Sequence, residues 1–226
     1  MDGLEGRSMP IIDISPVVRA STPVWPGDTP FRLGSTWSID AGDTVTVGNV
    51  VTTTHVGAHI DAPAHVLRGA PAILDTPLDA CVGPCVVLDV SGLVDRGARP
   101  HAQPELDAVR ARCAALGITG RIERLLLRHA ATPNERWDED LPGVAPEVMR
   151  WFAEQGGLLM GIDIASFDPA DSTELACHRA GIASGVVLLE GLDLTAAPEG
   201  RAELIALPLP WDGADASPVR AVLRVP

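Results

Sequence analysis

The chain has 226 residues, of which 46% are hydrophobic and 21% are charged, and its formal net charge is -13 at pH 7. This length supports one substantial hydrophobic core. The acidic balance argues against a nucleic-acid partner, because binding to phosphate backbones needs a basic surface. No apolar run has the length of a membrane span and no signal-peptide core follows the N-terminus, so we expect a cytoplasmic protein without a membrane partner.

The missing residue types limit the chemistry. All 17 basic residues are arginines, and the chain has no tyrosine. Proton transfer must therefore use His, Asp, Glu, Cys or a water molecule bound to a metal ion, since lysine and tyrosine cannot contribute. Four cysteines in a chain of this size do not suggest a disulfide framework, and we expect free thiols. They are Cys81, Cys85, Cys113 and Cys177.

Strand-like runs dominate the first half of the chain. Residues 11–14 favour a short strand, and the proline-rich residues 22–30 predict a loop. The Val- and Thr-rich residues 44–54 predict a strand that leads directly into a histidine-rich stretch. Residues 85–90 predict a buried strand that ends at Ser91 and Gly92.

Helices and strands alternate in the second half. Apolar residues at helical spacing predict amphipathic helices over residues 105–116 and 146–155. Strands are expected at residues 124–128, 158–164, 185–189, 202–209 and 219–225. This alternation, without an internal repeat or a linker, predicts a single α/β domain with a mixed sheet over residues 1–226.

Half of the six histidines lie between residues 55 and 65, in the sequence His-Val-Gly-Ala-His-Ile-Asp-Ala-Pro-Ala-His. A straight strand would place His55 and His59 about 13 Å apart, too far to share an ion. A continuous helix is disfavoured by Gly57 and by the proline near the end of the segment. We therefore expect a strand that ends in a bend assisted by glycine.

Imidazole nitrogens and a carboxylate oxygen are the usual ligands of zinc and similar divalent ions. A single histidine is more often a structural residue, but the density of ligand-type residues here favours a metal site formed by His55, His59 and Asp61. The third histidine, His65, has three alternative roles: a metal ligand, a residue that orients a ligand, or a general acid and base.

A second group of polar residues lies between residues 161 and 190. Asp163, Asp168 and Asp171 follow an expected strand, where they could be ligands or residues of turns and helix caps. The capping interpretation is favoured for Asp171 and Ser172. His178 taken alone would more often be structural.

Three stretches resemble one known family, the cyclase-like metal-dependent hydrolases. The first is Thr-Pro-Val-Trp-Pro-Gly-Asp-Thr-Pro at residues 22–30, and the second is His-x-Gly-x-His-x-Asp-x-Pro-x-His at residues 55–65. The third is Asp-Pro-Ala-Asp-Ser at residues 168–172, with His178 and Glu190 downstream. The histidine pattern is typical of the whole family, whereas the other two stretches are similar to its bacterial kynurenine formamidases (arylformamidases). The resemblance covers nearly the whole chain.

The resemblance implies a swivelling β/β/α fold and an assembly that is at least a homodimer. It implies an amidohydrolase that converts N-formyl-L-kynurenine to L-kynurenine and formate in tryptophan degradation, with two Zn²⁺ ions per subunit, or Mn²⁺ in their place. Seven residues receive roles from the resemblance. They are His55, His59 and Asp61 on one ion, His178 on the second, Asp61 and Glu190 as bridges, His65 as proton donor and acceptor, and Trp25 in the substrate pocket.

Two residues depart from the family pattern. Ala58 stands where relatives often have Thr, and His129 stands where we expect a small polar residue. We interpret His129 as a surface histidine or one that supports the site, and we leave it and His101 out of the site. For Trp25, ordinary loop packing is as well supported as a place in the substrate pocket. The alternative functions are another amide hydrolase of the family, such as one that opens isatin, and a non-catalytic metal- or small-molecule-binding protein.

Overall fold

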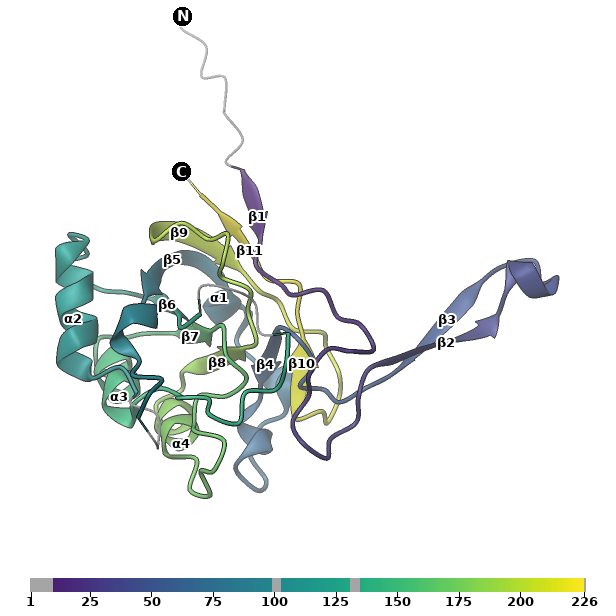
Figure 1. The fold of residues 1–226 in the computed structure, drawn as a ribbon, viewed down its shortest axis with the longest axis horizontal. Helices are drawn as coiled ribbons and strands as arrows, with labels where there is room; N and C mark the ends of the chain where they lie inside the picture. Colours follow the sequence, from purple (N-terminus) through teal and green to yellow (C-terminus); the bar gives the residue numbers. More distant parts are fainter. Residues whose placement is uncertain (1–9, 99–102, 131–134, 226) are drawn as a thin grey trace, which may run out of the picture.

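The computed structural model describes residues 10–98, 103–130 and 135–225 (Figure 1). Within these residues, nine strands form one mixed sheet. In spatial order they are β1 (Ile11–Asp13), β11 (Val222–Arg224), β9 (Gly200–Ile205), β5 (Val82–Asp89), β6 (Arg124–Arg128), β7 (Leu159–Ile162), β8 (Val187–Glu190), β4 (His59–Asp61) and β10 (Ala216–Pro218). The consecutive pairs from β5 to β8 are parallel, and the others are antiparallel.

The helices cover one face of the sheet (Figure 1). They are α2 (Leu106–Ala115), α3 (Pro146–Glu154) and α4 (Ala176–Ala183), while the short α1 (Leu78–Cys81) precedes β5. Successive residues of a strand point to opposite faces, so Leu125 and Leu127 of β6 pack under the helices. Leu126 between them packs into a second core on the other face. The central strands are therefore apolar on both faces, as parallel strands in α/β folds commonly are.

The second core lies where the sheet curls on itself. Leu204 and Leu223, from the β9 and β11 end, share this core with Ile60 and Leu189 from the β4 and β8 end. All four cysteines are buried and free, as expected from the composition. Among the described helices, none combines the length and the apolar character needed to cross a membrane.

Most of the predicted elements are confirmed. The two predicted helices begin and end within one residue of α2 and α3, and every predicted strand overlaps an observed one. The mixed α/β fold with few helices is also confirmed. The strands β2, β4 and β10 and the helices α1 and α4 were not predicted. The strands β4 and β10 have three residues each, and α4 begins after a left-handed residue, Leu175 (φ 51°).

The strand predicted over residues 44–54 is shorter in the structure than expected. Only β3 (Val47–Val51) is extended there, and it pairs with β2 (Arg32–Trp37) outside the main sheet. The two strands form a hairpin that projects from the body of the molecule (Figure 1). Val and Thr residues favour an extended backbone, but this preference does not select the partner strand.

Candidate metal centre

Two neighbouring strands bring three ligand-type side chains together. His59 and Asp61 are two residues apart on β4, so both point to the same face of the sheet. Glu190 lies directly opposite His59 in the antiparallel pairing of β4 with β8. Side chains opposite each other on paired strands are close neighbours. His59 Nε2 accordingly lies 3.4 Å from Glu190 Oε2 and 3.5 Å from Asp61 Oδ1.

The predicted bend before β4 is present and brings His55 back to the site. Gly57 has a φ of 62°, a conformation that glycine adopts without strain. His55 Nδ1 consequently lies 3.1 Å from Asp61 Oδ1. The bend is also tightly packed, because a Cβ atom on Gly191 would stand 2.3 Å from the carbonyl oxygen of Gly57. The residue after Glu190 must therefore be glycine for the two ligand segments to meet.

A hydrogen bond with the backbone selects the tautomer of His59. The Nδ1 atom lies 2.9 Å from the carbonyl oxygen of Gly57, which can only accept a hydrogen bond. In the neutral ring, Nδ1 therefore carries the proton and Nε2 presents its lone pair to the carboxylates. This arrangement is typical of histidines that bind metal ions.

Asp168 orients the fourth ligand-type residue, His178 of α4. Its carboxylate accepts hydrogen bonds from the backbone amides of Cys177 (2.9 Å) and His178 (3.0 Å), and so caps the first turn of the helix. It also lies 2.6 Å from His178 Nδ1. The opposite nitrogen, Nε2, then faces Asp61 Oδ2 at 3.4 Å and Glu190 Oε1 at 3.2 Å. Of the two roles left open for Asp168, the structure supports capping and orientation.

Burial and neighbouring charges act against each other in this cluster. Burial favours the neutral form of Asp61, but the imidazoles of His178 and His55 hold its pKa well below its usual range. Burial likewise opposes protonation of His178, but the carboxylates of Asp168, Asp61 and Glu190 raise its pKa to about 12. Burial also opposes protonation of His55. The carboxylates of Asp61 and Asp215 outweigh burial and raise the pKa of His55 to about 9. The anionic carboxylates thus require positive charge beside them.

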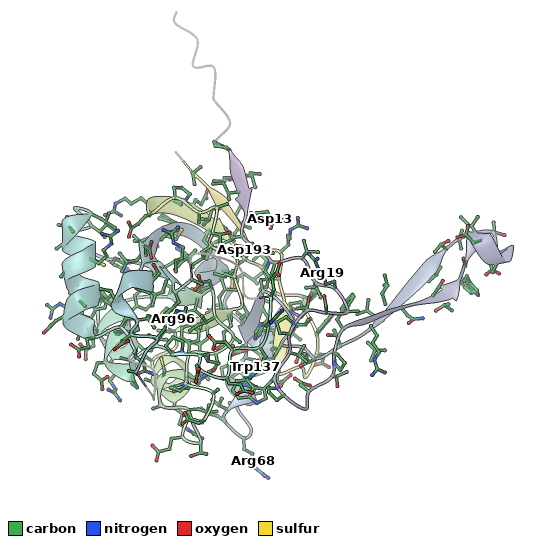
Figure 2. The ribbon with its side chains drawn as sticks, viewed as in Figure 1. Asp13, Arg19, Arg68, Arg96, Trp137 and Asp193 are labelled. Atoms are coloured by element: carbon green, nitrogen blue, oxygen red, sulfur yellow. The ribbon has the colours of Figure 1, made fainter. Side chains whose placement is uncertain are left out.

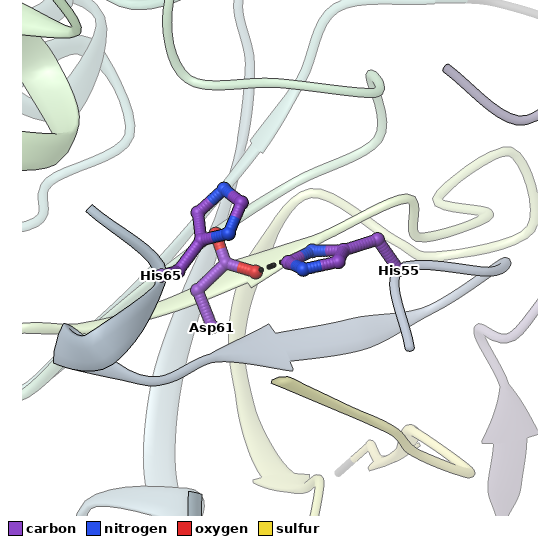
Figure 3. A group of neighbouring side chains, drawn as sticks. All are labelled: His55, Asp61 and His65. Atoms are coloured by element: carbon purple, nitrogen blue, oxygen red, sulfur yellow. Dashed lines mark ion pairs between the residues drawn. The ribbon is translucent and has the colours of Figure 1, made fainter. Parts of the chain in front are cut away.

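A divalent cation fits this requirement. Among the described residues, His59 Nε2 and both carboxylate oxygens of Asp61 are buried without a hydrogen bond of suitable geometry. Two groups of three residues have ligand atoms within 4.8 Å of one another. They are His55, Asp61 and His65, drawn in Figure 3, and His59, Asp61 and Glu190. Asp61 belongs to both groups, which is the arrangement needed to bridge two ions.

His65 lies at the more open side of the cluster, on a short 3-10 helix, Pro63–His65. Its Nδ1 lies 3.6 Å from Asp215 Oδ2, and the same carboxylate oxygen lies 3.2 Å from His55 Nε2. The hydroxyl of Thr54 donates to the other oxygen of Asp215 at 2.9 Å. Sequence reasoning missed Asp215, because it lies in an irregular loop outside the motifs and joins the site only through the pairing of β10 with β4.

A cavity of about 890 Å³ opens onto the cluster. His55, His59, His65, His178 and Glu190 line it on one side. Trp25 also lines it, and its ring makes an edge-on contact with Trp137, with ring centroids 4.8 Å apart. Trp25 is 42% exposed. The place of Trp137 beside the cavity was not predicted. The only sign of it in the sequence was a tryptophan within an acidic loop.

The surface interpretation of His129 was wrong. The residue is 1% exposed, and its Nδ1 lies 3.2 Å from Asp163 Oδ1. The Asp163 carboxylate also accepts from the backbone amides of His129 and Ala130, at 2.7 and 3.1 Å. Asp163 lines the cavity, whereas His129 does not. His101, the other histidine left out of the site, lies outside the described residues.

Comparison with known proteins shows the family of this chain. The Cyclase family model matches residues 12–169. This chain belongs to the Cyclase family. A kynurenine formamidase from Sphingopyxis alaskensis is 43% identical over 217 residues, which cover 95% of this chain and 97% of that protein. A kynurenine formamidase from Salinibacter ruber is 41% identical over 219 residues, with 96% and 98% coverage.

Solved structures of Cyclase-like proteins have the same fold. A protein described as a predicted metal-dependent hydrolase, from Bacillus stearothermophilus, has a TM-score of 0.75 and 26% identity, and covers 95% of this chain and 97% of its own. An isatin hydrolase bound to thioisatinate has a TM-score of 0.79 and 22% identity, with 96% and 92% coverage. At this low identity, the isatin hydrolase supports the fold alone.

The role of Asp168 is testable by the change Asp168→Asn. The amide keeps one acceptor oxygen for the three donors that the carboxylate now accepts, so the hydrogen bond that fixes the proton on His178 Nδ1 is weakened or lost. We expect divalent metal affinity to fall by about 10- to 100-fold. Calorimetric titration of metal-free protein with Zn²⁺ measures this change. Asp171→Asn, at an exposed position of the same loop, is the matched control, and equal affinities in the two variants would contradict the assignment.

Proposed function

We propose that this protein hydrolyses N-formyl-L-kynurenine to L-kynurenine and formate, a step of tryptophan degradation. The observation that carries the proposal is the 43% identity with a kynurenine formamidase along nearly the full length of both chains. The geometry supports it. A cluster suited to divalent cations lies at the base of a cavity that also has two tryptophan rings in its wall.

The proposed cofactor is Zn²⁺, with two ions in each subunit, and Mn²⁺ is the alternative metal. The proposed ligands are His55, His59 and Asp61 for one ion and His178 for the other, with Asp61 and Glu190 as bridges. Asp61 belongs to both groups of candidate ligand atoms, which supports its role as a bridge. His178 Nε2 lies 3.4 Å from Asp61 Oδ2 and 3.2 Å from Glu190 Oε1, which supports its place beside the two bridging carboxylates. Divalent ions in such a site supply electrophilic activation of a water molecule and of the amide carbonyl.

His65 is proposed to move the proton. Hydrolysis adds water to the formyl carbon, breaks the bond between that carbon and the arylamine nitrogen, and requires a proton on the departing nitrogen. The side chain of His65 is 32% exposed and can exchange protons with solvent. Its Nδ1 atom lies 3.6 Å from Asp215 Oδ2. The exposed position also separates His65 from the buried ligand His59.

Trp25 is proposed to hold the aromatic ring of the substrate. Its indole lies on a proline-rich loop and is braced edge-on by Trp137. A braced indole offers a rigid apolar face on which an aryl group can pack in an offset or edge-on manner. This arrangement favours an N-formyl arylamine over an aliphatic formamide.

Purified protein loaded with metal is expected to release kynurenine from N-formyl-L-kynurenine, measured by the absorbance of the product. A chelator should abolish the release, and added Zn²⁺ or Mn²⁺ should restore it. Opening of isatin without cleavage of N-formyl-L-kynurenine would favour the other hydrolase activity of the family. Bound metal without hydrolysis of any amide would indicate a binding protein.

Two histidine variants separate the proposed ligand from the proposed proton donor. His59→Ala should lose both bound metal and activity, because it removes a buried lone pair from the cluster. His65→Ala should keep most of its metal while kcat falls by about 10²- to 10⁴-fold, the usual contribution of general acid catalysis. Metal content by mass spectrometry, compared with kcat, tests both. The opposite ranking would show that the two roles are exchanged.

We also propose that the protein is a homodimer in which the β2–β3 hairpin of each subunit packs on its partner. Every residue of both strands is exposed, and Leu33 and Val50 are 71% and 55% exposed. A two-stranded hairpin is at best marginally stable in water, and its apolar side chains need cover. A second subunit can cover these apolar side chains, and it is present wherever the protein itself is present.

The change Leu33→Glu combined with Val50→Glu should shift the protein from dimer to monomer, because it places charges in the proposed contact. Sedimentation velocity gives the assembly state. Leu74→Glu, at an apolar residue that is 51% exposed outside the hairpin, is the control. A wild-type protein that is a monomer, or a double variant that remains a dimer, would refute this assignment of the hairpin.

A further inference from the structure

The cavity above the metal centre contains an arginine that the proposed chemistry does not use. Carboxylates dominate the charged side chains that line it, as expected for a protein with a net charge of -13. Within the described part of the chain, its lining includes two basic side chains, Arg19 and Arg136. A cation retained in an acidic cavity indicates recognition of an anionic group.

The backbone around Arg19 is held firmly beside the metal centre. The Arg19 amide donates to the hydroxyl of Thr22 at 2.8 Å, and the Thr22 amide donates to the carbonyl oxygen of Arg19 at 2.9 Å. The preceding residue, Val18, packs against Gly57, where an added Cβ atom would stand 2.7 Å from Val18 Cγ2. Gly57 forms the bend between the proposed ligands His55 and His59. The segment that carries Arg19 thus packs directly against the bend between His55 and His59.

The guanidinium of Arg19 makes no hydrogen bond or ion pair with any residue that the structure describes. Between Asp13 and Asp28 it is the only charged residue of the chain. Asp13 is already paired, because Arg220 Nε donates to it at 3.0 Å. Figure 2 labels Arg19 on the loop near the base of the β2–β3 hairpin, in the same connection that carries Trp25.

The second cation of the cavity, Arg136, has different surroundings. It follows Glu135 directly and precedes Asp138 by two residues, so acidic residues flank it along the chain. Arg96 is paired with Asp138 at 3.5 Å. Arg136 itself makes no hydrogen bond or ion pair with the described residues, but its neighbour Glu135 places a carboxylate next to it in the chain, whereas no acidic residue lies within five residues of Arg19. Arg19 is therefore the better candidate for binding an anion.

We propose that Arg19 binds the α-carboxylate of an aryl amino acid substrate while Trp25 contacts the aromatic ring. This inference rests on the proposed function and defines which part of the substrate is recognised away from the reacting bond. A guanidinium binds a carboxylate through two parallel charge-assisted hydrogen bonds, and it stays charged at every physiological pH. The enzyme thereby selects N-formyl arylamines that carry an amino acid group over simple N-formyl arylamines.

The expected effect on KM and kcat follows from the place of the α-carboxylate in the substrate, away from the formyl group that reacts. The α-carboxylate does not change charge when the formyl group is hydrolysed, so its contact with Arg19 has similar strength in the ground state and the transition state. Loss of such a contact raises KM and leaves kcat largely intact. A substrate without the carboxylate should not sense the loss.

The test compares two substrates in the metal-loaded protein. One is N-formyl-L-kynurenine, and the other is N-formyl-2-aminoacetophenone, which keeps the ring, the ketone and the formamide but lacks the amino acid group. For Arg19→Gln, kcat/KM on the first substrate should fall by about 10- to 100-fold, mainly through KM. On the second substrate it should change by less than about twofold. Arg110→Gln, at an exposed position of α2 away from the cavity, is the matched control.

Several results would overturn the inference. Equal losses on both substrates would indicate a structural role for Arg19, and unchanged kinetics on both would show that it does not contact the substrate. A selective loss in Arg136→Gln, with none in Arg19→Gln, would move the carboxylate site to the other cation. Hydrolysis of neither N-formyl compound by the wild-type protein would overturn the proposed function and this inference together.

Discussion

The attraction between two buried carboxylates and the imidazoles around them is the interaction on which the site depends. Asp61 and Glu190 are both buried, and neither can remain ionised there without positive charge close by. The carboxylates correspondingly raise the pKa of His55 and of His178, which favours positive charge on these imidazoles. The same cluster is therefore prepared for divalent cations, which replace protons when they bind.

The backbone around this cluster is built so that distant segments can approach. Gly57 and Gly191 meet almost backbone to backbone, and neither position leaves room for a side chain. Asp168 uses one carboxylate to cap α4 and to orient His178, so the start of the helix and the direction of a ligand are coupled. The positions of the proposed ligands are thus set by the close approach of two backbone segments and by the short side chain of Asp168.

The region between β1 and β4 links three properties of the molecule. Its first part carries Arg19 and Trp25 along the cavity, its middle part forms the exposed hairpin, and its last part leads into His55. A backbone hydrogen bond from Thr53 to Thr29, of 3.0 Å, closes the base of the hairpin. The proposed subunit contact, the proposed substrate contacts and the proposed metal ligand His55 therefore all lie on one continuous segment.

The sequence by itself determined the local part of this design. The two-residue spacing of His59 and Asp61 places both on one face of any strand, and the glycine before them permits the bend, because both properties depend only on the adjacent backbone. The tertiary structure alone decided that Glu190 lies opposite His59, that Asp215 and Trp137 join the site, and that residues 47–51 leave the main sheet. These outcomes depend on strand register and loop packing between residues far apart in the chain, and no local pattern specifies them.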